Sequence, residues 1–96
     1  MKEIWPFNDP KNVAVITTKK VLDKTKSILY VSHDEDDGMW QFHDGGIVSE
    51  EDGRIITLEE ATIIDSSIIE LADLPLGWIA EREDIKEKWN KYKKKV

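Results

Sequence analysis

The stretch ILYVSHDEDDGMWQFH, residues 28–43, carries the clearest signal for the fold. Two runs rich in β-branched and aromatic residues, 28–33 and 39–43, flank the acidic sequence DEDDG at 34–38. Such side chains favour strands, and a Gly that follows several acids favours a tight turn with positive φ. The stretch therefore predicts a β-hairpin whose turn is 34–38.

A turn at 34–38 also predicts a register for the hairpin. It pairs His33 with Met39, Ser32 with Trp40, and Tyr30 with Phe42. Alternation along the strands then predicts a core-facing set made of Ile28, Tyr30, Ser32, Trp40 and Phe42. The two histidines, His33 and His43, fall together on the other face, separated by roughly 13 Å at ~3.3 Å per residue. At that separation one metal ion cannot bind both.

The rest of the chain predicts further strands and short helices. Strands are expected at 13–18, 54–57 and 78–82. Helices are expected at 58–63 behind a Thr57–Glu60 capping box, after an N-cap at Asp65 or Ser66, and at 83–92, where Ile85, Trp89 and Tyr92 recur at helical spacing. Residues 1–12 and 44–53 are expected to be irregular, and 19–27 fits either one helical turn or a continued strand. The prediction is a single α+β domain over residues 1–96: a mainly antiparallel sheet of four to five strands with two to three short helices on one side.

Composition excludes several classes of protein. The chain has 96 residues and no Cys, so disulfide frameworks and thiolate metal sites are excluded. It has no apolar run near the ~20 residues that span a membrane. The first ten residues, MKEIWPFNDP, carry Pro and acids where a signal peptide has its apolar stretch. We therefore expect a soluble, cytoplasmic protein.

The charge is unevenly distributed along the chain. Residues 33–60 hold ten acids against one Arg, a balance of −9, whereas residues 83–96 hold six Lys against three acids, a balance of +3. An acidic centre disfavours nucleic acid as a partner, because phosphate contacts need Lys and Arg. It favours a basic protein instead, so the predicted partner-binding residues are Asp34, Glu35, Asp36, Asp37, Glu50, Glu51 and Asp52. The simpler interpretation, which the hairpin pattern favours, is that the acids at 34–37 form an exposed, solvated tip. The Lys-rich end is interpreted as a frayed helix terminus whose cations suit the helix dipole, and not as a nucleic-acid site.

Catalytic and metal motifs are not recognisable. Counted from Asp34, the sixth and twelfth positions of a calcium loop are Met39 and Gly45, which do not fit. Ser32, His33 and Asp34 are neighbours on a strand, so they cannot form a relay. The sequence DGG at 44–46 lacks the Lys and spacing of a phosphate-binding loop. We therefore expect no catalytic residues, no metal and no cofactor.

Two segments together resemble a known family. DDGMWQF at 36–42 resembles the acidic D-S-G-W-x-F element of the bacterial Immunity protein 33 family, although Met39 is inserted before the Trp. Residues 57–83 resemble the family's second element at Asp65, Ile68, Ile69, Leu71, Pro75, Gly77, Glu81 and Arg82, with Trp78 as a departure. The resemblance covers about half the chain. It implies an association with secreted toxins, and it implies no catalytic residues.

Three functions remain open on the sequence. The leading interpretation is a non-catalytic binding protein, with an immunity protein that neutralises a basic toxin as its specific form. The second is an accessory module that binds a small ligand or a cellular partner through the same hairpin. The third is a hydrolase-type enzyme that uses His33 or His43 with a nearby carboxylate, which requires that carboxylate within hydrogen-bond reach. The sequence does not define an oligomeric state.

Overall fold

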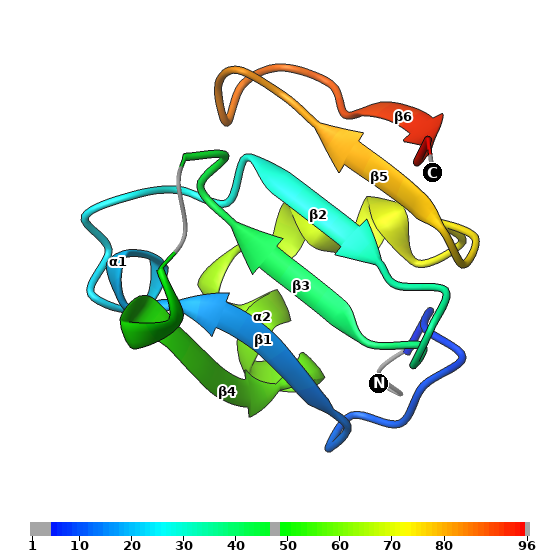
Figure 1. The fold of residues 1–96 in the computed structure, drawn as a ribbon, viewed down its shortest axis with the longest axis horizontal. Helices are drawn as coiled ribbons and strands as arrows, with labels where there is room; N and C mark the ends of the chain where they lie inside the picture. Colours follow the sequence, from blue (N-terminus) through cyan, green and yellow to red (C-terminus); the bar gives the residue numbers. More distant parts are fainter. Residues whose placement is uncertain (1–4, 47–48, 96) are drawn as a thin grey trace, which may run out of the picture.

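The computed structural model describes residues 5–46 and 49–95 and confirms a single α+β unit (Figure 1). Its sheet has six strands in the spatial order β4-β1-β3-β2-β5-β6. The strands are β1 (Ala14–Thr18), β2 (Tyr30–His33), β3 (Trp40–His43), β4 (Gly53–Thr57), β5 (Trp78–Glu81) and β6 (Asn90–Lys93). β1 and β3 pair in parallel, and the other neighbours pair antiparallel. The sheet is mainly antiparallel, as predicted, with one strand more than expected.

Within residues 5–46 and 49–95, the helical segments are α1 (Lys19–Leu22), the 3-10 turn η1 (Glu50–Asp52), α2 (Leu58–Ile64) and the 3-10 helix η2 (Ser66–Leu71). The predicted capping box starts α2, because Thr57 and Glu60 exchange side-chain and backbone hydrogen bonds. Asp65 caps η2 by accepting a hydrogen bond from the Ser67 amide at 2.9 Å. No helix in the described part of the chain is both long and apolar enough to cross a membrane.

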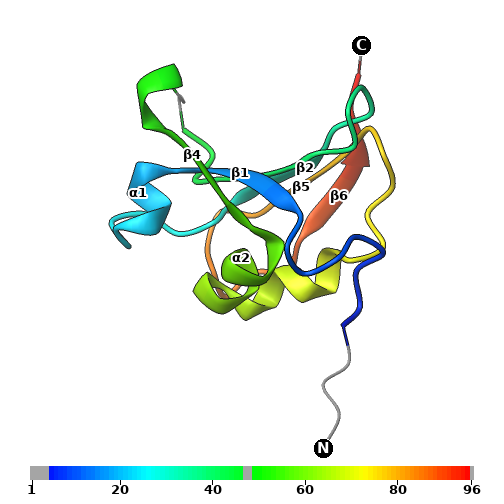
Figure 2. The same cartoon turned by 90° about the horizontal axis from the view of Figure 1, so that it is seen from below.

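The core lies on one face of the sheet, where α2 and η2 pack against it (Figure 2). The sheet contributes Val15, Val31, Trp40, Phe42 and Ala80, and the segments that cover it contribute Phe7, Val21, Ile28, Leu58, Ala61, Ile68, Leu71 and Leu74. Among the described residues, no helix covers the opposite face of the sheet (Figure 2). Side chains on that face are therefore available to line a site.

The hairpin closes one residue later than the sequence predicts. The Asp34 amide donates to the Met39 carbonyl at 2.8 Å, so these two residues continue the strand pairing and the turn is 35–38. His33 consequently pairs with Trp40 rather than with Met39. The turn residues alone do not show whether Asp34 belongs to the turn or to the strand, and this ambiguity is the source of the error.

The shift changes which side chains share a face. Trp40 and Phe42 are buried as predicted, at 2% and 0% exposure. Their partners across β2 are His33 and Val31, so the prediction that Tyr30 shares their face is wrong. His43 pairs with Tyr30 on the open face of the sheet. The prediction that His33 and His43 share a face is therefore also wrong.

The predicted helix at 83–92 does not form. Residues 82–89 are irregular, and β6 then pairs antiparallel with β5, with Tyr92 opposite Ile79. Ile85 and Tyr92 are 56% and 37% exposed, so no buried stripe exists. Strand pairing prevails because β5 would otherwise present unpaired N–H and C=O groups at the sheet edge. The exposed lysines of β6 suit the new edge of the sheet.

Arg82 joins the sheet to the helical layer from a buried position. Its side chain is 2% exposed. Nη2 donates to the Ile28 carbonyl at 3.0 Å and to Oδ2 of Asp65 at 2.6 Å, and Nη1 donates to Oγ of Ser67 at 2.9 Å. The ring of Trp89 covers the guanidinium, with 4.0 Å between Cζ and the ring centroid. These contacts satisfy the buried charge and fix the start of η2 against the end of β5.

Candidate functional site

The four acids 34–37, which we call the acidic turn, comprise the last strand-paired residue, Asp34, and the first three residues of the turn, and they have a defined conformation. The Gly38 amide donates to the Asp34 carbonyl at 2.8 Å, and Gly38 has a φ of +74°, which glycine adopts without strain. The Asp37 carboxylate accepts a hydrogen bond from the Met39 amide at 2.9 Å. Asp37 is thus engaged in stabilising the turn. Glu35 and Asp36 make no hydrogen bond or ion pair with any residue that the structure describes.

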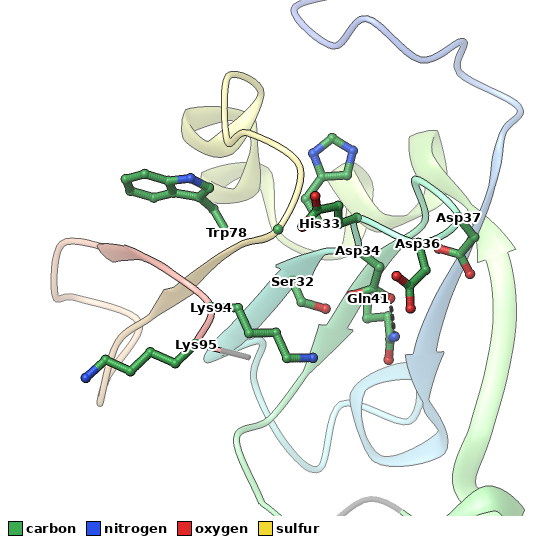
Figure 3. A pocket seen from close by; sticks show the side chains of 11 residues that line it. Ser32, His33, Asp34, Asp36, Asp37, Gln41, Trp78, Lys94 and Lys95 are labelled. Atoms are coloured by element: carbon green, nitrogen blue, oxygen red, sulfur yellow. Dashed lines mark hydrogen bonds between the residues drawn. The ribbon is translucent and has the colours of Figure 1, made fainter.

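This turn borders a pocket of about 320 Å³ at the end of the sheet (Figure 3). The pocket is lined by Ser32, His33, the four acids 34–37, Gln41, Gly77, Trp78, Lys94 and Lys95. Ser32, Asp34, Gln41 and Lys94 point to the same side of the sheet, whereas the rings of His33 and Trp78 point away from them (Figure 3). We call this site the acidic pocket.

Gly77 shapes one wall of the acidic pocket. It has a φ of +82°, and a Cβ placed there would approach Oε2 of Glu35 to 3.0 Å. Its carbonyl accepts the Lys94 amide at 2.8 Å, and its amide donates to the His33 carbonyl at 2.7 Å. Gly77 therefore lets the Glu35 side chain lie close to the backbone and brings the C-terminal lysines beside the acidic turn.

A row of hydrogen bonds leads from the acidic pocket along the open face of β3. Nε2 of Gln41 donates to Oδ2 of Asp34 at 2.5 Å, and Oε1 of Gln41 lies 2.8 Å from Nε2 of His43. With the Gln41 amide nitrogen facing Asp34, the His43 Nε2–H is the donor to Gln41 Oε1. The row fixes the Asp34 carboxylate at the pocket wall.

The surroundings of His43 favour its neutral form. Its side chain is buried, and Nδ1 has no hydrogen-bond partner among the described residues. Burial lowers the pKa of His43, while the carboxylates of Asp44 and Asp34 oppose the shift. Burial also raises the pKa of the neighbouring Tyr30, whose ring centroid is 6.0 Å from that of His43. Both neighbours thus favour their uncharged forms on this part of the sheet.

The ring of His33 packs against the core and points away from the other polar side chains of the pocket. Its Nδ1 lies 2.7 Å from the Leu74 carbonyl, to which it donates, and its ring stacks on Trp40 with centroids 3.9 Å apart. In the described part of the chain, neither His33 nor His43 makes a hydrogen bond to a carboxylate. The geometry gives the hydrolase alternative no support.

The structure separates the predicted partner-binding residues into two groups. β1 and β3 run in parallel with Ile16 beside Gln41, so Thr18 lies at the end of the sheet away from the acidic turn. Gly53 pairs with Thr18, which places η1, with Glu50, Glu51 and Asp52, at that far end (Figure 1). Asp34, Glu35, Asp36 and Asp37 come together at the pocket, and the acids of η1 do not join them.

The predicted site lacks several residues that line the pocket, among them Ser32, Lys94 and Lys95. Ser32 was placed in the core by the wrong register, although its position next to the acidic turn was a usable signal. Lys94 and Lys95 were interpreted as a frayed helix end, and only the pairing of β6 with β5 brings them to the pocket. Local sequence gives no sign of that pairing.

Comparisons with protein-family models, curated proteins and solved structures found no match. The resemblance to the Immunity protein 33 family therefore stays a prediction from the sequence. The matched residues now have places in the fold: Asp65 and Arg82 form an ion pair, Ile68 and Leu71 are buried, and Gly77 lines the acidic pocket.

Proposed function

We propose that this protein is a non-catalytic binding protein of the cytoplasm that takes a basic protein as its partner through the acidic turn. The observation that supports this best is that the turn carboxylates border a pocket, which offers a partner side chain a place to insert. Clustered charge of one sign also attracts an oppositely charged partner and speeds association. Neutralisation of a basic toxin is the specific form that the family resemblance suggests.

The proposal assigns the contact to residues 34–37 and leaves η1 outside it. The two acidic groups lie at opposite ends of the sheet, and screening limits each to a range of about 8–10 Å at physiological salt. A small-ligand module is the second candidate, because a pocket of about 320 Å³ falls within the range of small-molecule sites.

Two double variants with the same change of charge test the assignment. Glu35→Gln with Asp36→Asn neutralises the two turn acids that make no hydrogen bond, and we call it the turn variant. Glu50→Gln with Glu51→Gln neutralises two acids at the far end, and we call it the η1 variant. Partners are captured from the native host with the tagged wild-type protein, purified, and titrated against all three proteins.

We expect the turn variant to weaken binding at least tenfold, on the order of 1.4 kcal/mol, and the η1 variant to change it less than about twofold. Equal affinity of the turn variant and the wild type would contradict the proposal. A larger loss in the η1 variant would move the contact to the far end of the sheet. A captured partner that is a small molecule would favour the second candidate.

A further inference from the structure

We infer that the acidic pocket receives one cationic side chain of the partner, a guanidinium or an alkylammonium group, with Ser32 Oγ as a hydrogen-bond acceptor at its floor. This inference rests on the proposed function and adds the chemistry of the contact. Three features carry it: an unpartnered hydroxyl that a largely buried residue presents to the pocket, the charge balance of the lining, and a lysine of the chain itself at the same place.

Ser32 is a largely buried residue whose hydroxyl oxygen opens to the pocket. It is 6% exposed, and its hydroxyl makes no hydrogen bond to any of the described residues. Its cross-strand neighbours explain this, because Ile79 is apolar and the Gln41 amide is engaged with Asp34 and His43. The hydroxyl points to the pocket side of the sheet, toward Gln41 and Lys94 (Figure 3). The Ser32 side chain is thus unpartnered within the described chain, and its hydroxyl is open to accept a hydrogen bond from a ligand donor in the pocket.

The net charge of the residues that line the pocket favours a cationic ligand. Four carboxylates and two ammonium groups border the pocket, which leaves a net charge of −2. Asp34 is fixed by Gln41, and Asp37 is engaged with the Met39 amide. Glu35 and Asp36 keep free acceptors, as noted for the acidic turn. A guanidinium offers five donors and matches carboxylate and hydroxyl acceptors set at several angles.

Lys94 brings a cation of the chain itself to this position. Its backbone is held by the Gly77 carbonyl, and its side chain lies on the same side as Ser32 and Gln41 (Figure 3). Within the described chain the ammonium makes no ion pair, so it is not locked in place. An incoming cation must displace it or bind against its charge. Lys94 is thus a weak internal competitor for the pocket.

The test uses a single-residue probe, Nα-acetyl-L-arginine amide, with the neutral isostere Nα-acetyl-L-citrulline amide as its matched control. Titrations are followed by amide chemical shifts in two-dimensional NMR. We expect saturable shifts centred on Ser32, Gln41 and Gly77 with the arginine probe, and affinity at least about tenfold lower with citrulline, which has the same shape but lacks the charge and two of the five N–H donors. N-acetylglycine serves as an anionic probe.

Three variants test whether the affinity for the arginine probe changes in the expected direction. Ser32→Ala should weaken the arginine probe about three- to tenfold, as loss of a hydrogen bond to a charged group does. Lys94→Ala should tighten binding about two- to fivefold, because it removes a like charge. Lys26→Ala removes the same charge from an exposed loop outside the pocket and should leave affinity unchanged. The dispersion of the free spectra confirms that each variant is folded.

Several results overturn the inference. Equal affinity for the arginine and citrulline probes would show that the pocket does not select a cation. Weaker arginine binding by Lys94→Ala, or preferential binding of N-acetylglycine, makes the pocket an anion site. If the turn variant weakens partner binding but no probe shift centres on Ser32, the proposed function stands. The inference that a cationic side chain enters the pocket is then wrong. If the arginine probe binds as expected but no partner depends on the turn, the pocket binds cations, but the proposed function is wrong and a partner side chain is not the occupant.

Discussion

Asp65 and Arg82 are 17 positions apart in the sequence and form an ion pair of 2.6 Å between Oδ2 and Nη2. Asp65 lies between α2 and η2 and caps the start of η2. Its carboxylate therefore both caps this helix and neutralises the buried guanidinium. Both residues belong to the segment that resembles the Immunity protein 33 family. The segment thus describes a junction between the helices and β5, and the binding site that we propose lies outside this junction, at the acidic pocket.

Asp65→Asn should lower the free energy of unfolding by about 3–5 kcal/mol, because it leaves a buried guanidinium without a counter-charge. Asn preserves the N-cap acceptor, so the loss reports the charge. The matched control is Lys91→Ala, which breaks an exposed pair with Asp73 and should cost about 0–1 kcal/mol. Urea denaturation measures both. Losses of similar size would show that burial does not strengthen the Asp65 pair.

Trp40→Ala should cost about 3–5 kcal/mol in the same denaturation experiment. The variant loses a ring that is 2% exposed, its stack on His33 and the hydrogen bond from Nε1 to Asp9 Oδ2 at 2.9 Å. Ile63→Ala removes an apolar side chain that is 78% exposed and should change stability by less than about 0.5 kcal/mol. A loss below about 1 kcal/mol for Trp40→Ala would place this ring outside the core.

The elements that follow local rules were predictable from the sequence. The capping box at Thr57, the β-branched strand of β1 and the hairpin with buried Trp40 and Phe42 are signals contained within a few residues. The exact register was not, because it depends on whether Asp34 joins the strand or the turn. The helix expected at 83–92 failed for a related reason: its residues fit a helix locally, but the edge of β5 provides hydrogen bonds that only the folded sheet can offer.

The site was predictable in part. The acids 34–37 stand out in the sequence, and the structure places them at a pocket. Glu50, Glu51 and Asp52 looked equivalent to them, because charge counted along the chain ignores that the two loops leave opposite ends of the sheet. Ser32 and Lys94 reach the pocket through strand pairing over long sequence distances, which no local pattern encodes.

The wild-type protein should lose stability as the pH falls below about 6.5, the ordinary pKa of His. Burial lowers the pKa of His43 in the folded state, so folding favours its neutral form. Its contribution is therefore complete above pH 6.5 and is lost as the pH falls toward the lowered pKa. Urea denaturation from pH 7.5 to 5.5 measures the effect.

His43→Gln provides the control for this pH dependence, since it removes the titrating group. We expect its free energy of unfolding to change less than that of the wild type over the same pH range. The carboxylates near His43, Asp34 and Asp44, remain in both proteins, so they contribute equally to the comparison. Parallel pH profiles would show that His43 does not titrate differently in the folded and unfolded states.

Association with the basic partner should depend on salt through the acidic turn. If the turn steers the encounter, the association rate constant of the wild type should fall by tenfold or more between low and physiological ionic strength, because screening shortens the reach of its charges to about 8–10 Å. The turn variant should start from a slower rate and show a flatter salt dependence, and its dissociation rate should change less than its association rate. The η1 variant has the same net charge as the turn variant but keeps the acids of the turn. Its association and dissociation rates should therefore follow those of the wild type. Stopped-flow mixing with the purified partner separates the two rates. Coincident salt profiles for the wild type and the turn variant would show that the acidic turn is only a solvated loop, and that the partner contacts another surface.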